Sequence, residues 1–148
     1  QTIASARTVV IVRDPIHALD SLKRSRALRK EKHLSWPQFS LCVAEMQAMV
    51  ARIQECPQDR IHWIRYEDLV SNAHGTMKAL AAWIGIEFED CLLQPTMLSQ
   101  EWPGISSFKS TAGIEALPAG RTVQSLDSFD LDYVDAHLNE FRKHFGYA

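Results

Sequence analysis

Apolar residues follow one another without interruption near the start of the chain and then give way to a helical pattern. Residues 9–12 are four β-branched residues with no alternation, which is typical of a strand buried on both faces of a parallel sheet. Asp14 and Pro15 come next, and these residue types are favoured at the N-cap and at the first position of a helix. We therefore predict a strand over residues 9–12 and a helix over residues 15–30.

A second helix is indicated by a capping box, in which Ser35 and Gln38 stand three residues apart with Pro37 between them. Apolar residues then recur at steps of three and four until the chain reaches Pro57, before which we expect the helix to end. This spacing places them on one broad face of the helix, which indicates packing against a core. The residues of this face are Phe39, Cys42, Val43, Met46, Met49, Val50 and Ile53.

Strand and helix patterns continue to alternate in the second half of the chain. Residues 61–66 have the composition of a second strand, and Asn72 is placed to cap a helix that Gly85 ends in the left-handed conformation. We expect Asp130 to cap a last helix, which Gly146 ends. The alternation favours an α/β fold, a parallel sheet flanked by helices.

Residues 87–121 interrupt this regularity. Because an irregular connection of this length is uncommon in a compact domain, we expect a functional or ligand-covering loop here. The residues that exclude any long element from it are Pro95, Pro103, Gly104, Gly113, Pro118 and Gly120.

Composition adds few constraints. The 148 residues are 46% hydrophobic, which suits one globular domain over residues 1–148, and a net charge of −2 gives no reason to expect a nucleic-acid partner. No apolar run approaches the roughly 20 residues of a membrane span. Three widely spaced cysteines suggest neither a disulfide framework nor a zinc site, so we expect a reducing, cytoplasmic compartment and no metal. The chain opens at Gln1 only a few residues before a strand, and we expect it to be the later part of a longer protein.

Arg13 is the first candidate for chemistry. It stands where the first strand ends and a helix begins, which is where open α/β sheets bind ligands and where helix N–H groups favour an anion. A guanidinium there can hold a phosphate through two parallel hydrogen bonds. The alternative is a surface salt bridge at a strand end. The basic residues of the first helix are open to two interpretations, a solvated surface or a basic rim near an anionic ligand.

Several short motifs then occur in a recognisable order. They are Arg13-Asp14-Pro15 with Ser21, Tyr66-Glu67-Asp68, Trp83-Ile84-Gly85-Ile86, Ser106-Ser107-Phe108, Gly120-Arg121 and Gly146-Tyr147. In this order and spacing the chain resembles sulfotransferases that use 3′-phosphoadenosine 5′-phosphosulfate (PAPS), in particular those of bacterial type. The resemblance covers almost the whole chain, and it implies a P-loop-kinase-like fold that is incomplete at the N-terminus.

The resemblance also implies roles for individual residues. Arg13 and Ser21 match residues that bind the 3′-phosphate of PAPS, and Tyr66 matches a tyrosine that contacts adenine. An ordinary helical serine and a half-buried aromatic at a strand end are the alternatives for Ser21 and Tyr66.

Three later residues match the donor site as well. Ser107 and Phe108 resemble residues that flank the adenine or the 3′-phosphate, with plain loop packing as the alternative. Arg121 resembles a second phosphate ligand.

The implied reaction is transfer of a sulfuryl group from PAPS to an acceptor hydroxyl or amine on a small molecule or a glycan. The family cradles the 5′-phosphosulfate with a lysine-bearing loop near its N-terminus, and its general base also tends to lie upstream. No glycine in this sequence directly precedes a Lys-Ser or Lys-Thr pair, so we identify no catalytic residue in this chain and expect the missing N-terminal part of the domain as its partner. The alternatives are a nucleotide-binding or assembly module without turnover, and a P-loop kinase relative that uses a nucleoside triphosphate.

Overall fold

The computed structural model describes residues 6–31, 33–94, 96–97, 100–101 and 122–147. They belong to two compact units, each with its own elements. The first comprises Gln1–Val12 and Gln58–Arg121, and the second comprises Arg13–Pro57 and Thr122–Ala148. No helix among the described residues is long and apolar enough to cross a membrane.

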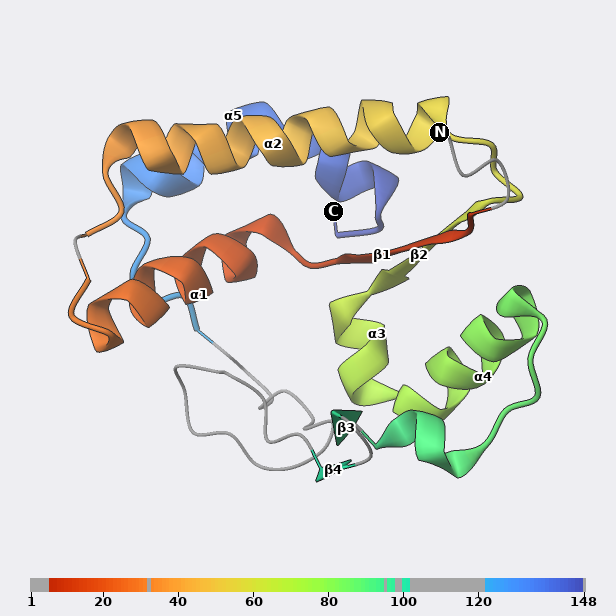
Figure 1. The fold of residues 1–148 in the computed structure, drawn as a ribbon. Coiled ribbons are helices and arrows are strands. Elements are labelled where there is room, and N and C mark those ends of the chain that lie inside the picture. The colour runs from red at the N-terminus through yellow and green to blue at the C-terminus, as the bar shows by residue number, and fades with distance from the viewer. Residues whose placement is uncertain (1–5, 32, 95, 98–99, 102–121, 148) are drawn as a thin grey trace. The chain divides into compact units, whose positions relative to one another are not determined.

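A small parallel sheet is the centre of the first unit. Strand β1 (Thr8–Val12) pairs with β2 (Ile61–Arg65), with Thr8 opposite Ile61 and Val12 opposite Arg65. The two strands run side by side in Figure 1. Helices α3 (Tyr66–Ser71) and α4 (Ala73–Ile84) follow directly after β2. The predicted α/β class with parallel strands is therefore confirmed in this smaller form. Among the described residues of the unit, the buried apolar side chains are Val12, Ile61, Ile64, Val70 and Ala81.

The expectation that β1 is buried on both faces is wrong for the described residues. Only Val12 of the strand is fully buried, while Val9 is 39% exposed and Ile11 is 57% exposed. The physical reason is that the sheet of the described residues has two strands, and an all-parallel sheet needs covering layers on both faces before its side chains lose contact with water.

The end of β2 also differs from the prediction. The strand ends at Arg65, and Tyr66 is the first residue of the short helix α3 rather than the last residue of a strand. Beyond it the predicted caps of α4 are confirmed. The side chain of Asn72 accepts a hydrogen bond from the Gly75 N–H at 3.2 Å, and Gly85 ends the helix with φ of 87°.

The expected loop over residues 87–121 is described only in part. A 3-10 helix, η1 (Asp90–Leu93), follows α4, and β3 (Thr96–Met97) pairs antiparallel with β4 (Gln100–Glu101). The remaining positions of that prediction, residues 95, 98–99 and 102–121, lie outside the described residues.

The described residues of the second unit form three helices. They are α1 (Pro15–Leu28), α2 (Trp36–Glu55) and α5 (Ser128–His144), and α5 packs against both of the others. Figure 1 shows α5 alongside α2. The predicted capping box of Ser35 and Gln38 is present at the start of α2, and α2 ends before Pro57 as expected. The buried apolar side chains are Leu19, Phe39, Val43, Ile53, Val134, Leu138, Phe141 and Phe145.

The start of α5 corrects one assignment. Its N-cap is Asp127, and Asp130 is the third helical residue of a capping box instead of the cap itself. The Asp127 side chain accepts from the Asp130 N–H at 2.9 Å, and the Asp130 side chain accepts from the Asp127 N–H at 3.1 Å. Two acidic residues three positions apart can exchange these roles in a sequence pattern, so only the backbone distinguishes them. Gly146 follows the helix with φ of 73°, as predicted.

Candidate functional site

The turn between β1 and α1 positions Arg13. The strand ends at Val12, Asp14 is the N-cap of α1, and Pro15 is its first residue. Proline fits that position because it lacks the N–H that the helix would leave unpaired. Arg13 is half-buried, and its Nε and Nη2 atoms are shielded from solvent. A guanidinium at this turn is therefore partly desolvated, and partial desolvation strengthens its interaction with an anion.

The first-turn N–H groups of α1 are already used within the protein. The Asp14 side chain accepts hydrogen bonds from the N–H groups of Ile16 at 2.8 Å and His17 at 3.3 Å. The N–H of Ala18 donates to the Asp14 carbonyl oxygen at 2.8 Å. The sequence argument that free helix N–H groups favour an anion here is therefore not supported, because an internal carboxylate satisfies them. Anion binding at this turn has to depend on side chains.

Ser21 lies on the same helix, on its second turn, and is half-buried. The rise of an α-helix places it about 9 Å along the axis from Pro15. A long arginine side chain and a phosphate group together can span such a separation. Arg13 and Ser21 thus belong to the same compact unit, with Ser21 on α1 and Arg13 in the turn that precedes it.

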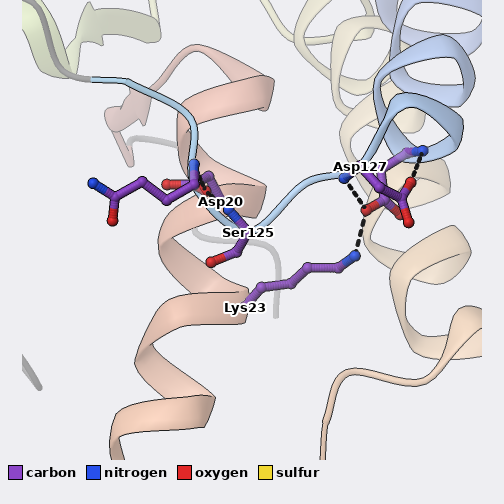
Figure 2. Close-up of polar contacts among 6 residues, drawn as sticks. Asp20, Lys23, Ser125 and Asp127 are labelled. Carbon is purple, nitrogen blue, oxygen red and sulfur yellow. Dashed lines mark hydrogen bonds and ion pairs between the residues drawn. The ribbon is translucent and has the colours of Figure 1, made fainter.

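Asp20 directly precedes Ser21 and is a residue that the sequence analysis missed. Its side chain is fully buried, and one oxygen, Oδ1, accepts from the N–H of Gln124 at 2.8 Å and from the N–H of Ser125 at 2.7 Å. The Arg24 guanidinium lies 3.8 Å from the other oxygen, Oδ2. We call residues 122–127, which precede α5, the lead-in segment. Figure 2 shows Asp20 at the point where this segment passes α1.

A sequence signal for Asp20 does exist. Asp20 is four residues after Ile16, and Lys23 is four residues after Leu19. Residues four apart share a helix face, so both charged residues fall on the face that the apolar residues define. A charged side chain on an apolar face is informative because its burial requires a partner.

Two basic residues of α1, and Arg29 directly after it, take part in internal ion pairs. Lys23 pairs with Asp130 of α5, Arg24 pairs with Asp20, and Arg29 pairs with Glu31. The carboxylate partners of Lys23 and Arg24 are 5% and 0% exposed. The pairing of these two basic side chains favours neither a freely solvated surface nor a rim that attracts anions. Their charge is balanced within the unit.

Tyr66 belongs to the other compact unit. It is half-buried and opens α3, whose first turn carries the acidic residues Glu67 and Asp68. Negative charge at a helix N-terminus opposes the binding of a further anion. This start of a helix therefore suits a neutral base better than a phosphate. Ser107, Phe108 and Arg121, the other predicted site residues, lie outside the described residues.

The comparison with protein families covers the turn between β1 and α1 and both strands of the parallel sheet. The model of the family described as "Sulfotransferase family" matches residues 1–90. The chain belongs to the sulfotransferase family. The matched part of this sulfotransferase chain contains Arg13, Ser21 and Tyr66 but ends before Ser107, Phe108 and Arg121. No curated protein matches the chain.

A solved structure agrees with the family on the fold. The sulfotransferase domain from the curacin biosynthetic pathway matches with a TM-score of 0.56 and 18% sequence identity. The match covers 92% of this sulfotransferase chain and 54% of that domain. The chain thus spans about half the length of the solved domain, and at this identity the likeness concerns the fold alone.

The described part of this sulfotransferase chain contains no group of three or more His, Cys, Asp or Glu residues that could hold a metal ion. The two residues predicted to bind the donor at this turn, Arg13 and Ser21, offer a guanidinium and a hydroxyl, and both groups donate hydrogen bonds to phosphate.

Proposed function

We propose that the full-length protein transfers a sulfuryl group from PAPS to an acceptor hydroxyl or amine. In this proposal the chain described above supplies the 3′-phosphate and adenine side of the donor site. The acceptor is a small molecule or a glycan. Membership of the sulfotransferase family supports the reaction class.

The observation that carries the proposal is the position of Arg13. It is half-buried directly after β1, beside the capped start of α1, with two guanidinium nitrogens shielded from solvent. The adjacent helix N–H groups are taken by Asp14, so the guanidinium is the cationic donor that this turn offers. We propose that the Arg13 guanidinium binds the 3′-phosphate through two parallel hydrogen bonds, and that the Ser21 hydroxyl donates a single hydrogen bond to the same group.

The chemistry explains why such a site matters. Sulfuryl transfer depends on positioning and on charge stabilisation, as phosphoryl transfer does. The 3′-phosphate is remote from the transferred group and distinguishes PAPS from ATP-like nucleotides. Binding free energy gained at that phosphate can therefore orient the donor for in-line attack by the acceptor, with adenosine 3′,5′-bisphosphate as the product.

The other assignments remain predictions from the sequence. They are the adenine contact of Tyr66, the contacts of Ser107 and Phe108 near the base or the 3′-phosphate, and the second phosphate ligand Arg121. The lysine-bearing loop for the 5′-phosphosulfate and the general base belong, in this proposal, to the N-terminal part of the domain.

Calorimetry on the full-length protein tests the proposal. Adenosine 3′,5′-bisphosphate should bind at least about tenfold more tightly than AMP, because each charge-assisted hydrogen bond contributes about 1.5–3 kcal/mol. Arg13→Ala should remove most of this preference. Arg29→Ala is the matched control, since Arg29 lies just after α1, is half exposed and pairs with Glu31.

The alternatives give different results. Equal binding of the two nucleotides, or a preference that survives Arg13→Ala, would overturn the assignment of Arg13. A P-loop kinase relative would instead bind ATP in a magnesium-dependent manner. A nucleotide-binding module without turnover would retain the preference for the bisphosphate but transfer no sulfuryl group from PAPS to any acceptor.

A further inference from the structure

Asp20 is a charged residue whose burial requires stabilising partners. Its side chain is fully buried on α1, between the apolar Leu19 and the proposed phosphate ligand Ser21. Burial of a carboxylate is unfavourable unless hydrogen bonds and opposite charge compensate for the lost water. Here two backbone N–H groups at 2.8 and 2.7 Å and the Arg24 guanidinium at 3.8 Å supply that compensation.

The hydrogen bonds connect parts of the chain that are more than a hundred residues apart. The separations are 104 residues to Gln124 and 105 residues to Ser125. A second connection follows one turn further along α1, where Lys23 pairs with Asp130 at the start of α5. Figure 2 shows both connections, with the lead-in segment running between them. Asp20 thus holds this segment against α1, and Lys23 connects the first turn of α5 to the same helix.

Gln124 and Ser125 form an irregular part of the chain before α5. Their N–H groups have no helical or sheet partner to direct them, so the carboxylate sets their position.

We propose that Asp20 is a positioning residue of the donor-nucleotide site. Its buried carboxylate holds Gln124 and Ser125 against the turn of α1 that carries Ser21, and so keeps that turn in place for the 3′-phosphate. Asp20 is assigned no contact with the nucleotide, because its side chain is fully buried and its Oδ1 already accepts two backbone N–H groups. This inference rests on the proposed function, since it assumes that the Ser21 turn faces a 3′-phosphate.

The test compares variants of the full-length protein by calorimetry with adenosine 3′,5′-bisphosphate and with AMP. Asp20→Ala should lower the preference for the bisphosphate by about tenfold, whereas loss of stability alone would weaken both nucleotides in proportion. Asp20→Asn should keep most of the preference, because the amide oxygen can accept both N–H groups that Oδ1 now accepts. Lys23→Met is the matched control, because it removes the connection to α5 and leaves the connection to the lead-in segment.

Each outcome is decisive. A normal preference in Asp20→Ala, an Asp20→Asn protein that behaves like Asp20→Ala, or a Lys23→Met protein that loses the preference equally would overturn the positioning role while the proposed function stands. A wild-type protein without any preference would overturn both. If circular dichroism shows that Asp20→Ala does not fold, Gln124→Pro removes one of the two N–H donors at an exposed residue and should lower the same preference.

Discussion

Lys23 of α1 forms an ion pair with the same Asp130 oxygen that completes the capping box of α5. Oδ2 of Asp130 accepts from Lys23 Nζ and, at 3.1 Å, from the N–H of Asp127. Asp130 is 4% exposed, and the Lys23 ammonium also lies 5.0 Å from the centre of the Phe39 ring on α2. One lysine therefore contacts all three helices of its unit, and this suggests a measurable contribution to stability.

Lys23→Met should lower the free energy of unfolding by about 1.5–3 kcal/mol, because it leaves a buried carboxylate without its cation. Urea unfolding followed by circular dichroism measures this. Lys143→Met is the control, since Lys143 and Glu140 form a pair whose side chains are 56% and 86% exposed. That change should cost about 0.5 kcal/mol or less. Equal effects of the two variants would contradict the structural role given to Lys23.

Gly85→Ala should destabilise the first unit by about 1–2 kcal/mol, because Gly85 has φ of 87° and an L side chain is strained in the left-handed region. Space is not the reason, since among the described residues a Cβ there would meet only Arg7 Nη1 at 4.0 Å. Gly75→Ala tests the opposite case, in which lack of space rather than backbone strain opposes a Cβ atom. A Cβ at Gly75 would come within 2.5 Å of the Asn72 side chain and displace that cap. The higher helix propensity of alanine offsets the loss, so the net change should be within about 0.5 kcal/mol.

Arg7→Met should loosen the end of α4. Arg7 Nη1 donates to the carbonyl oxygens of Trp83 at 2.7 Å and Ile84 at 2.6 Å, and the guanidinium lies 5.4 Å from the centre of the Trp83 ring. These carbonyls are among those that a helix leaves unpaired at its C-terminus. We expect faster hydrogen exchange at the Gly85 N–H and a loss of about 1 kcal/mol. Arg52→Met, which removes an exposed pair with Glu45, should change neither quantity, and unchanged exchange in Arg7→Met would contradict this role.

Ser21→Ala should weaken binding of adenosine 3′,5′-bisphosphate by about tenfold and leave AMP binding unchanged, because one hydrogen bond to a charged phosphate is lost. Ser25→Ala is the matched control, since it makes the same change on α1 one turn further from Arg13. Calorimetry on the full-length protein distinguishes them. Identical affinities in the two variants would indicate that Ser21 is an ordinary helical serine.

Local features of the fold could be predicted because they depend on residues a few positions apart. The Asp14 and Asn72 caps, the Ser35 capping box and the left-handed Gly85 all follow from residue type and spacing. The same approach failed where two local solutions were equivalent. Asp127 and Asp130 could each cap α5, and Tyr66 could end a strand or begin a helix.

The sequence also named residues of the candidate site, and their roles stay predictions. The Arg13 turn and Ser21 were identified from a motif, and the structure places both in one unit. Asp20 was missed because its partners are more than a hundred residues away, and no local pattern specifies a partner at that distance. The exposure of Val9 and Ile11 was missed for the same reason, since burial depends on the elements that pack over a strand and not on the strand itself.

The sequence by itself determined the order of the two parallel strands and the four longer helices, most of their caps and the family motif around Arg13, because these depend on short-range backbone chemistry. Only the tertiary structure decided how the charges near that motif are used. It showed that Asp20 binds the lead-in segment and that Lys23 pairs with Asp130. The physical reason is that the interactions of a buried charged side chain depend on the partners that folding brings next to it, and those partners are distant in the sequence.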